Sequence, residues 1–428
     1  MIDEKVILQV LEEQRDEVLN YDSNHWVKRG EESFFEIDSQ LAQVVIGVRR
    51  SGKSTLCHKV LKEHGVTYAY VNFDDDRLVG MQTPELNTLL TCIYQIYGVD
   101  IQYIFFDEIQ NVDGWHIFIN RLLRANMRVF VTGSNAKLLS GELATHLTGR
   151  YNEIRLFPFS FAEYCSYHAI DTKSSTTKAE AIRRNAFVQY VNDGGFPEVQ
   201  TLNNKRGYVQ SLLDAVIQKD IQQRFRIRNV DILRKTSYQL ISTPCQCVNY
   251  DDLSEILQVS DKTLRNYVDY LRQAFLVQLL PKFSFKSKER IVGEKSYLVD
   301  TGLENNRDYS MAAENLGWRL ENVVYIELLR RCSNKYLDVY YYKPTTNSKE
   351  IDFVVCNQNN PQELIQVAYD ISAPKTFNRE TSALVDGAEM LNCNNLTLIT
   401  IAPSRTVEVK GKIIKIQSAI DWLLNTTL

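Results

Sequence analysis

The chain has 428 residues, of which 44% are hydrophobic and 24% are charged. Because this length exceeds that of one ordinary domain, we expect about three domains, each with a buried core. The 49 lysines and arginines are balanced by 53 aspartates and glutamates, so the formal net charge is only -4. This balance excludes binding to nucleic acid through an overall basic field, and any such binding must come from a local patch.

Residues 1–20 have the pattern of an acidic amphipathic helix, without the charged and then apolar order of a signal peptide. No apolar run in the sequence approaches the length that spans a membrane. The eight cysteines form no C-x-x-C pair and no metal-ligand spacing with the six histidines, so we expect buried, reduced thiols. These features predict a cytoplasmic protein with no membrane partner.

The first chemical motif follows residues 43–46, an apolar stretch that indicates a short buried strand. Residues 47–54 read GVRRSGKS and fit the pattern G-x-x-x-x-G-K-[ST] of a phosphate-binding loop. In such a loop backbone N–H groups turn inward, Lys53 reaches the β- and γ-phosphates, and Ser54 ligates Mg²⁺. The residues predicted to hold the nucleotide are Gly47, Arg49, Arg50, Ser51, Gly52, Lys53, Ser54 and Thr55.

Strands and helices alternate after this loop. We expect helices at 53–63, 84–97 and 115–125, and strands at 66–75, 102–108, 128–134 and 152–157. This alternation predicts an α/β fold, in which a parallel sheet with helices on both faces forms a P-loop core.

The strand at 102–108 runs into Asp107 and Glu108. An aspartate at the carboxyl end of a buried strand can hold the Mg²⁺ shell, and the adjacent glutamate can orient or deprotonate the attacking water. The alternative is an ordinary strand that ends in two surface acids, but the phosphate-binding loop favours the functional interpretation. Because the acidic pair is present and a guanine-reading N-K-x-D motif is absent, the sequence favours ATP hydrolysis over a GTPase switch.

Two further positions are candidates for contact with the γ-phosphate. The next strand ends in Ser134 and Asn135, which can touch the γ-phosphate or its water, although Gly-Ser-Asn is also good turn chemistry. Arg150 lies just before the strand at 152–157. A guanidinium supplied by a neighbouring copy can stabilise the transition state, which would make the active unit a homo-oligomer. The alternative is a surface arginine in a loop.

The rest of the chain changes character. A polar stretch at 171–180 precedes helical periodicity at 181–226, which is interrupted at NDGGFPE, residues 192–198. Three short helices and two strands follow between 230 and 300, and mixed elements continue to the end. We therefore predict four domains: an ATPase core with its N-terminal helix at 1–170, a helical lid at 171–228, a winged helix at 229–304 and a C-terminal α/β domain at 305–428.

Residues 249–285 have the pattern of a helix-turn-helix, with the turn at Val259-Ser260 and Leu264, Val268 and Leu271 on one face of the second helix. The acids Asp251, Asp252 and Asp261 weaken the positive field, so DNA and a protein client both remain open as partners. The polar residues expected to face a partner are Lys262, Arg265 and Asn266 in the helix, and Lys282, Lys286, Lys288 and Arg290 in the wing.

A family resemblance joins these motifs. The series GVRRSGKST, VNFDDDRL, YIFFDEIQNVDGW, VFVTGSNAKLLSGELATHLTGR, IRLFPFSFAEY and NDGGFPE, continued by EIDFVV and LIQVAYDIS, resembles bacterial and archaeal AAA-type ATPases with a C-terminal domain of unknown function. It covers nearly the whole chain. The resemblance implies that Lys53 and Ser54 bind phosphate and Mg²⁺, and that Asp107 and Glu108 form the Walker B pair. It further implies that Ser134 or Asn135 is the sensor and Arg150 the finger or sensor arginine.

The C-terminal segments YYYKPTTNSKEIDFVVCNQ and PQELIQVAYD resemble restriction-endonuclease-like folds, with Glu321 on a preceding helix. A working site of that kind needs carboxylates for Mg²⁺ and usually a lysine on the strand after Asp352. That strand carries Gln366-Val367-Ala368 instead, so the lysine is missing, although Glu363 or Lys349 could substitute. We predict a degenerate domain that docks a partner.

The sequence as a whole predicts a cytoplasmic, Mg²⁺-dependent ATPase that couples ATP binding and hydrolysis to DNA or a protein. Two alternatives from other classes stay open. One is a nucleotide-gated binding module with negligible turnover, and the other is a metal-dependent nuclease.

Overall fold

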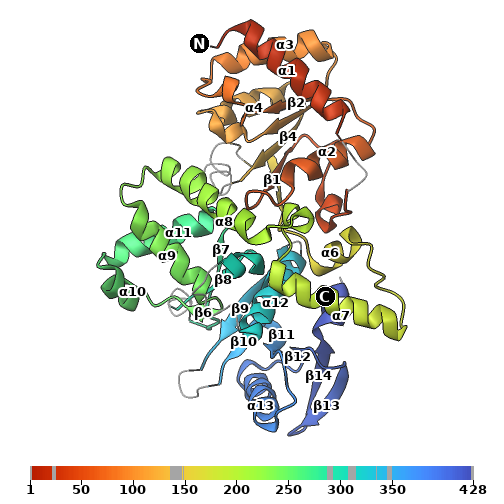
Figure 1. Ribbon diagram of the computed structural model, residues 1–428, viewed down its shortest axis with the longest axis vertical. Helices are drawn as coiled ribbons and strands as arrows, with labels where there is room; N and C mark the ends of the chain where they lie inside the picture. The colour runs from red at the N-terminus through yellow and green to blue at the C-terminus, as the bar shows by residue number, and fades with distance from the viewer. Residues whose placement is uncertain are drawn as a thin grey trace. The chain divides into compact units, whose positions relative to one another are not determined.

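The computed structural model describes residues 2–21, 26–134, 147, 149–286, 293–306, 315–333, 335–344 and 349–425 (Figure 1). The chain divides into two compact units, Met1–Phe157 with Gln273–Phe275, and Pro158–Arg272 with Leu276–Leu428. The finer division into four domains, with boundaries near residues 170, 228 and 304, stays a prediction.

The first unit is built on a five-stranded sheet in the order β2-β3-β4-β1-β5, and all of its strand pairs are parallel. A parallel sheet requires a crossover between consecutive strands, which is why helices alternate with strands here. The strands are β1 (Ala42–Ile46), β2 (Tyr68–Asn72), β3 (Tyr103–Asp107), β4 (Arg128–Gly133) and β5 (Tyr151–Arg155). The predicted P-loop α/β core is confirmed.

The helices of the first unit are α1 (Glu4–Leu19), α2 (Lys53–Glu63), α3 (Glu85–Tyr97) and α4 (Trp115–Arg124), with short 3₁₀ turns at Gly30–Phe34, Asp76–Leu78 and Ile109–Asn111. In α1 the buried residues are Ile7, Val10, Leu11 and Gln14, which share one face because they are three and four residues apart. Side chains from α2 and from the strands form one apolar core, which includes Val45, Leu56, Phe105, Phe130 and Ile154.

The second unit begins with helices α6 (Phe161–Tyr167), α7 (Thr177–Asp193), α8 (Lys205–Ala215), a π-helical segment (Val216–Gln223), α9 (Val230–Ser242), α10 (Tyr250–Leu257) and α11 (Asp261–Gln273). The short strands β6 (Gln246–Cys247), β7 (Val277–Leu280) and β8 (Lys295–Leu298) form an antiparallel sheet in the order β6-β8-β7. The predicted sequence of three short helices followed by two strands is present, with β6 in addition.

A six-stranded mixed sheet follows in the order β13-β14-β12-β11-β10-β9. Its strands are β9 (Leu337–Tyr342), β10 (Ile351–Asn357), β11 (Asn360–Val367), β12 (Leu396–Thr400), β13 (Arg405–Val409) and β14 (Lys412–Ser418), and its helices are α12 (Leu316–Ser333), α13 (Pro374–Leu391) and α14 (Ala419–Leu424). A second apolar core lies between this sheet and α13, with Val354, Leu364, Leu384 and Leu398 among its buried members. Strands β9–β14 and helices α12 and α13 are labelled in Figure 1.

The predicted helix break at 192–198 is present, and its glycines have a steric cause. Gly194 ends α7 with φ +77°, and a Cβ built on it would lie 1.7 Å from Oδ1 of Asp300. The backbone N–H of Gly195 donates a hydrogen bond of 2.7 Å to Oδ2 of the same carboxylate. Burial raises the pKa of Asp300 to about 6, although the hydrogen bond from the N–H of Gly195 opposes this rise. The turn therefore needs glycine because a buried carboxylate touches its backbone.

Seven of the eight cysteines are buried and all eight are free thiols, whereas Cys247 is exposed. The expectation of buried, reduced cysteines is thus wrong at this one position. Within the part of the chain that the structure describes, no helix combines the length and the apolar character needed to cross a membrane.

Candidate active site

The phosphate-binding loop connects β1 to α2, as the motif requires. Gly47 has φ +152°, and a Cβ there would lie 2.1 Å from the carbonyl oxygen of Leu156. Gly52, at φ +94°, precedes the first residue of α2. The glycines therefore allow the backbone to pass close to its neighbour and to turn into the helix N-terminus, where N–H groups are available for an anion.

Lys53 is buried at the start of α2, and its ammonium lies against its own loop. Its Nζ donates hydrogen bonds to the carbonyl oxygens of Gly47 at 3.1 Å and Val48 at 3.0 Å. Ser51 is fully buried, and its hydroxyl finds no hydrogen-bond partner among the described residues. Since buried polar groups are normally satisfied, a hydroxyl of this kind fits a loop that receives an anion.

The other predicted loop residues are placed as follows. Ser54 is half-buried on the first turn of α2, and the hydroxyl of Thr55 lies 3.0 Å from the hydroxyl of Tyr21. Arg50 adopts the left-handed conformation at φ +67°. Arg49 is directed to the end of β2, where its Nη1 lies 3.5 Å from Oδ2 of Asp74.

Arg29 supports the loop and was missed by motif reasoning. It precedes the 3₁₀ turn at Gly30–Phe34 and is buried, with 5% of its surface exposed. Its guanidinium donates to the carbonyl oxygens of Ser51 at 3.3 Å and Phe157 at 2.6 Å. The sequence shows an arginine before the first strand, but no local pattern indicates that its side chain contacts the phosphate-binding loop.

Asp107 ends β3 at the carboxyl edge of the sheet, between the ends of β2 and β4. Its carboxylate accepts hydrogen bonds from the hydroxyl of Tyr70 at 3.1 Å and from the hydroxyl of Thr132. Burial, followed by the negative charge of Asp107, raises the pKa of Tyr70, so this phenol stays a donor. Two neighbouring strands thereby orient the carboxylate predicted to hold the Mg²⁺ shell.

Glu108 adopts the left-handed conformation at φ +56°. Its Oε2 accepts hydrogen bonds from the backbone N–H of Ser134 at 3.3 Å, from the hydroxyl of Ser134 at 3.1 Å and from the amide of Gln110. Burial raises the pKa of Glu108, and the charge of Lys53 opposes this shift. The structure therefore joins Glu108 and Ser134, whereas Asn135 lies outside the described residues.

Arg150 lies at the opposite edge of this sheet. Its backbone carbonyl accepts a hydrogen bond of 3.0 Å from the N–H of Ala42, the first residue of β1, and its side chain is exposed. The phosphate-binding loop follows the other end of β1, so about 13 Å of strand separates the two positions. Strand pairing therefore places the backbone of Arg150 at the end of the strands away from the loop, and its role as a finger or sensor arginine stays a prediction.

The second unit contains a buried charged cluster around Lys295 of β8. Its Nζ lies 3.4 Å from Oε1 of Glu321 on α12 and also forms an ion pair with Glu350. Tyr297 donates a hydrogen bond of 2.7 Å to Glu321. Burial opposes the charge on Lys295, but the carboxylates of Glu321, Asp352 and Glu350 outweigh it and raise its pKa.

Asp352 belongs to the same electrostatic neighbourhood. Burial, followed by the charge of Glu321, raises its pKa, and its Oδ2 accepts a hydrogen bond of 2.8 Å from the backbone N–H of Val367. The side-chain amide of Gln366 donates a hydrogen bond of 2.7 Å to the carboxylate of Glu380. Among the described residues no group of three or more histidine, cysteine or acidic side chains could hold a metal ion.

The expected substitutes for the missing lysine are engaged elsewhere. Lys349 forms an ion pair of 2.7 Å with Asp386, and Glu363 accepts a hydrogen bond of 2.5 Å from Thr397. The lysine beside the carboxylates is instead Lys295, which comes from β8 and not from the strand after Asp352. Its distance along the chain is why the endonuclease-like pattern did not reveal it.

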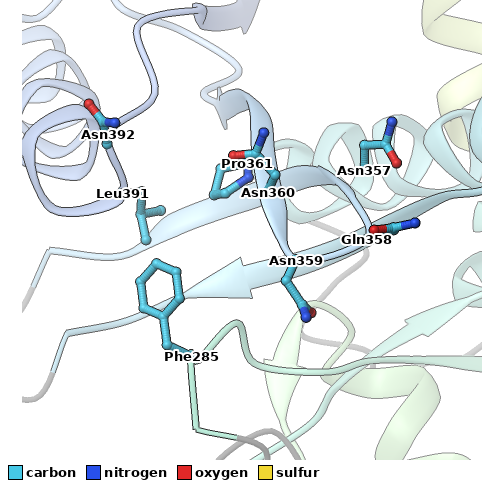
Figure 2. A pocket seen from close by; sticks show the side chains of 8 residues that line it. All are labelled: Phe285, Asn357, Gln358, Asn359, Asn360, Pro361, Leu391 and Asn392. Carbon is cyan, nitrogen blue, oxygen red and sulfur yellow. The ribbon is translucent and has the colours of Figure 1, made fainter.

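Figure 2 shows an open pocket of about 430 Å³ elsewhere in the second unit. Phe285 faces Leu391 across it, and the rest of the lining comes mainly from the amide-rich hairpin at 357–361 and from Asn392. Among the described residues that line it, none is an acid, a base or a nucleophile.

A parallel sheet in the order β2-β3-β4-β1-β5, with a phosphate-binding loop after β1 and an acidic pair at the end of β3, defines a P-loop ATPase core of the AAA type. Family models agree. An AAA domain matches residues 39–165, a domain of unknown function (DUF8612) matches 184–309 and another (DUF4143) matches 316–411.

Similar proteins span most of the chain. The uncharacterized protein MJ1544 of Methanocaldococcus jannaschii is 32% identical over 402 residues, which cover 89% of this chain and 88% of the relative. An uncharacterized protein of Haemophilus influenzae is 31% identical over 402 residues, which cover 90% of this chain and 95% of the relative. The chain therefore belongs to the family of these relatives, AAA-type P-loop ATPases with C-terminal domains of unknown function.

The solved structures that match the chain are less similar in sequence. The Walker-type ATPase PABY2304 of Pyrococcus abyssi is 12% identical, covers 72% of this chain and 95% of its own, and has a TM-score of 0.41. The RuvB Holliday junction branch migration motor of Thermotoga maritima is 16% identical. The match covers 65% of this chain and 88% of the RuvB chain, with a TM-score of 0.29.

Proposed function

We propose that this protein hydrolyses ATP with Mg²⁺ and couples the reaction to a partner bound by its second unit. The observation that carries the proposal is Glu108, a carboxylate with a raised pKa that Ser134 orients at the edge of the sheet where the phosphate-binding loop begins. A base whose pKa moves toward the working pH is better suited to accept a proton from water.

The chemistry follows from these positions. A water oxygen attacks the γ-phosphorus, its proton passes to the Glu108 carboxylate, and the bond from the γ-phosphorus to the bridging oxygen breaks, so that ADP leaves with the electron pair. Lys53 binds the β- and γ-phosphates after it leaves the carbonyls of its own loop. Ser54 and Asp107 would hold Mg²⁺, which neutralises phosphate charge when it is bound.

The module formed by α10, α11 and the sheet β6-β8-β7 supports a partner site. Lys262, Arg265 and Asn266 are exposed on α11, as a helix that contacts a partner requires. Arg265, however, forms an ion pair of 2.7 Å with Asp261 and lies over the ring of Tyr250 at 4.1 Å. Since this arginine is already engaged, we propose contact with DNA phosphates or with an acidic protein surface in preference to base reading. Lys288 and Arg290 of the expected wing lie outside the described residues.

Steady-state phosphate release tests the enzyme proposal directly. The wild-type chain should release phosphate from ATP in Mg²⁺, and Glu108→Gln should bind ATP but release little phosphate. Absence of turnover in the wild type, alone and with duplex DNA, would favour a nucleotide-gated binding module. DNA contact is tested by the binding of a labelled duplex to the wild type and to Lys262→Ala, with salt varied.

A further inference from the structure

Arg49 belongs to the phosphate-binding loop and follows a residue that Lys53 contacts. It is the residue after Val48, whose carbonyl oxygen accepts a hydrogen bond from Lys53 Nζ at 3.0 Å. Lys53 is the group that reaches the β- and γ-phosphates in a loop of this type. The side chain of Arg49 is largely covered, with 19% of its surface exposed. Arg49 is therefore next in sequence to the residue that contacts the phosphate-binding lysine.

The guanidinium of Arg49 is held by a carboxylate. Its Nη1 lies 3.5 Å from Oδ2 of Asp74, a residue that follows β2. The side chain of Asp74 is 43% exposed. A long ion pair with a half-exposed partner is weak in water, so a stronger anion can take the arginine from it.

Asp74 is fixed in position by the Walker B strand and the turn after it. Its Oδ1 accepts a hydrogen bond of 2.9 Å from the amide of Asn111, which also donates to the carbonyl oxygen of Phe73 at 3.1 Å. The backbone N–H of Phe73 donates a hydrogen bond of 2.9 Å to the backbone carbonyl oxygen of Asp107. The ion pair is thus anchored to the element that carries the catalytic acids.

The charges of both Arg49 and Asp74 reach Glu108. They act in opposite directions on its pKa: the negative charge of Asp74 raises it and the positive charge of Arg49 lowers it, while burial is the largest cause of the rise. Lys53 also acts on this carboxyl group. Arg49 and Asp74 therefore share one electrostatic neighbourhood with the proposed base and the phosphate-binding lysine.

We propose that Arg49 is a catalytic arginine that acts within its own chain, and that Asp74 holds it away from the phosphate site until ATP binds. The proposal rests on the proposed ATPase function and names a residue pair that supplies its transition-state charge. A triphosphate offers more negative charge than one carboxylate, and a guanidinium can bind two of its oxygens at once. Arg49 transfers no proton. It stabilises the charge that develops while the γ-phosphoryl group passes from ADP to water.

The arrangement also explains how one chain could hydrolyse ATP without Arg150. That residue lies at the other edge of the sheet, about 13 Å of strand away from the loop. A cis arginine and a trans arginine make different predictions, because the first does not depend on assembly.

The test compares Arg49→Ala, Arg49→Lys and Asp74→Asn with Arg77→Ala as the matched control. Arg77 belongs to the same unit and forms a shorter ion pair, 2.8 Å to Asp75, so its loss controls for a broken arginine–aspartate pair. Turnover is measured at protein concentrations where activity per chain is constant. ATP affinity, the melting temperature and the binding of ADP with aluminium fluoride, an analogue of the transferring phosphoryl group, are measured in parallel.

Arg49→Ala should lose about 10³-fold in turnover and lose the tight binding of ADP with aluminium fluoride, with ATP affinity largely kept. Arg49→Lys should recover only part of the turnover, because it keeps the charge without the bidentate geometry. Asp74→Asn should bind ATP more tightly without loss of turnover, and Arg77→Ala should match the wild type.

Two outcomes would overturn the inference while the ATPase function stands. In the first, Arg49→Ala turns over like the wild type. In the second, it loses ATP and ADP binding together with turnover, which would mark a structural role in the loop. A wild type without turnover would overturn the ATPase function and this inference with it.

Discussion

The hydroxyl of Ser134 donates a hydrogen bond of 3.1 Å to Oε2 of Glu108, and the backbone N–H of Ser134 donates to the same oxygen at 3.3 Å. The residues follow neighbouring strands, since β3 ends one residue before Glu108 and β4 ends one residue before Ser134. Strand pairing in the sheet therefore fixes the orientation of the proposed base.

Ser134→Ala should lower kcat about tenfold and leave ATP affinity almost unchanged. A hydrogen bond to a charged group contributes about 1.5–3 kcal/mol, and we expect the lower end because the backbone N–H and Gln110 still hold the carboxylate. Ser134→Thr keeps a hydroxyl and is the control. A raised KM with an unchanged kcat would instead assign Ser134 to substrate binding.

The raised pKa of Glu108 predicts an effect of pH on stability as well as on rate. In the folded chain burial disfavours the charged carboxylate, so the folded state loses stability as pH rises above the ordinary carboxyl pKa of about 4.3. Glu108→Gln removes this cost. Its melting temperature should exceed that of the wild type by a few degrees at pH 8, and the difference should vanish near pH 4.

The same shift predicts where the acid limb of the pH–rate profile lies. Turnover of the wild type should begin to fall at a higher pH than an ordinary carboxylate would allow, because the base must be ionised. If the wild type and Glu108→Gln have equal melting temperatures from pH 4 to pH 8, burial does not raise the pKa of Glu108.

The helix after the phosphate-binding loop and the turn at 192–198 were predicted correctly from local sequence patterns. The helix expected at 53–63 is α2, Lys53–Glu63, because the loop motif and an apolar face define it together. The expected turn at 192–198 is also present. These features depend on residues that are close along the chain.

Partners supplied by distant segments could not be predicted in this way. Tyr70 and Thr132 hold Asp107 only because β2 and β4 flank β3 in the sheet. Arg29 reaches the phosphate-binding loop from before β1, and Lys295 of β8 reaches Glu321 of helix α12. Such contacts are set by strand order and packing, which the composition of one segment does not encode.

Lys53→Ala should abolish the stabilisation of the protein by Mg-ATP without unfolding it. Lys53 Nζ donates hydrogen bonds to carbonyl oxygens of its own loop, those of Gly47 and Val48, and we expect the fold to tolerate their loss. Thermal shift with and without Mg-ATP measures the effect. An ATP-induced shift as large as that of the wild type would contradict the assignment of the phosphate-binding loop.

The buried cluster around Lys295 should be structural. The wild-type chain is expected not to nick plasmid DNA in Mg²⁺ or Mn²⁺, because the carboxylates of Glu321 and Glu350 are engaged in ion pairs with Lys295 and the strand after Asp352 carries no lysine. Lys295→Met should lower the free energy of unfolding by about 3–5 kcal/mol, since it leaves buried carboxylates without a cation. Lys286→Met, at an exposed position in the same unit, is the control. Nicking that disappears in Asp352→Ala would reverse this assignment.

The position of Arg150 decides whether a second arginine is supplied by another copy. Its side chain is exposed at the amino edge of the sheet, away from the phosphate-binding loop of its own chain. If it acts in trans, turnover per chain should rise with protein concentration, and Arg150→Ala should lose turnover while it keeps ATP affinity.

Mixing two inactive variants gives the sharper measurement for Arg150. Glu108→Gln supplies an intact arginine and Arg150→Ala supplies an intact base, so a trans contact should restore activity that neither variant has alone. The mixture of Glu108→Gln with Lys53→Ala is the control, because it combines two defects of the same phosphate site. If the first mixture stays inactive and wild-type turnover does not depend on concentration, Arg150 is a surface residue. Hydrolysis would then depend on groups within one chain, among which Arg49 belongs to the phosphate-binding loop and acts electrostatically on Glu108.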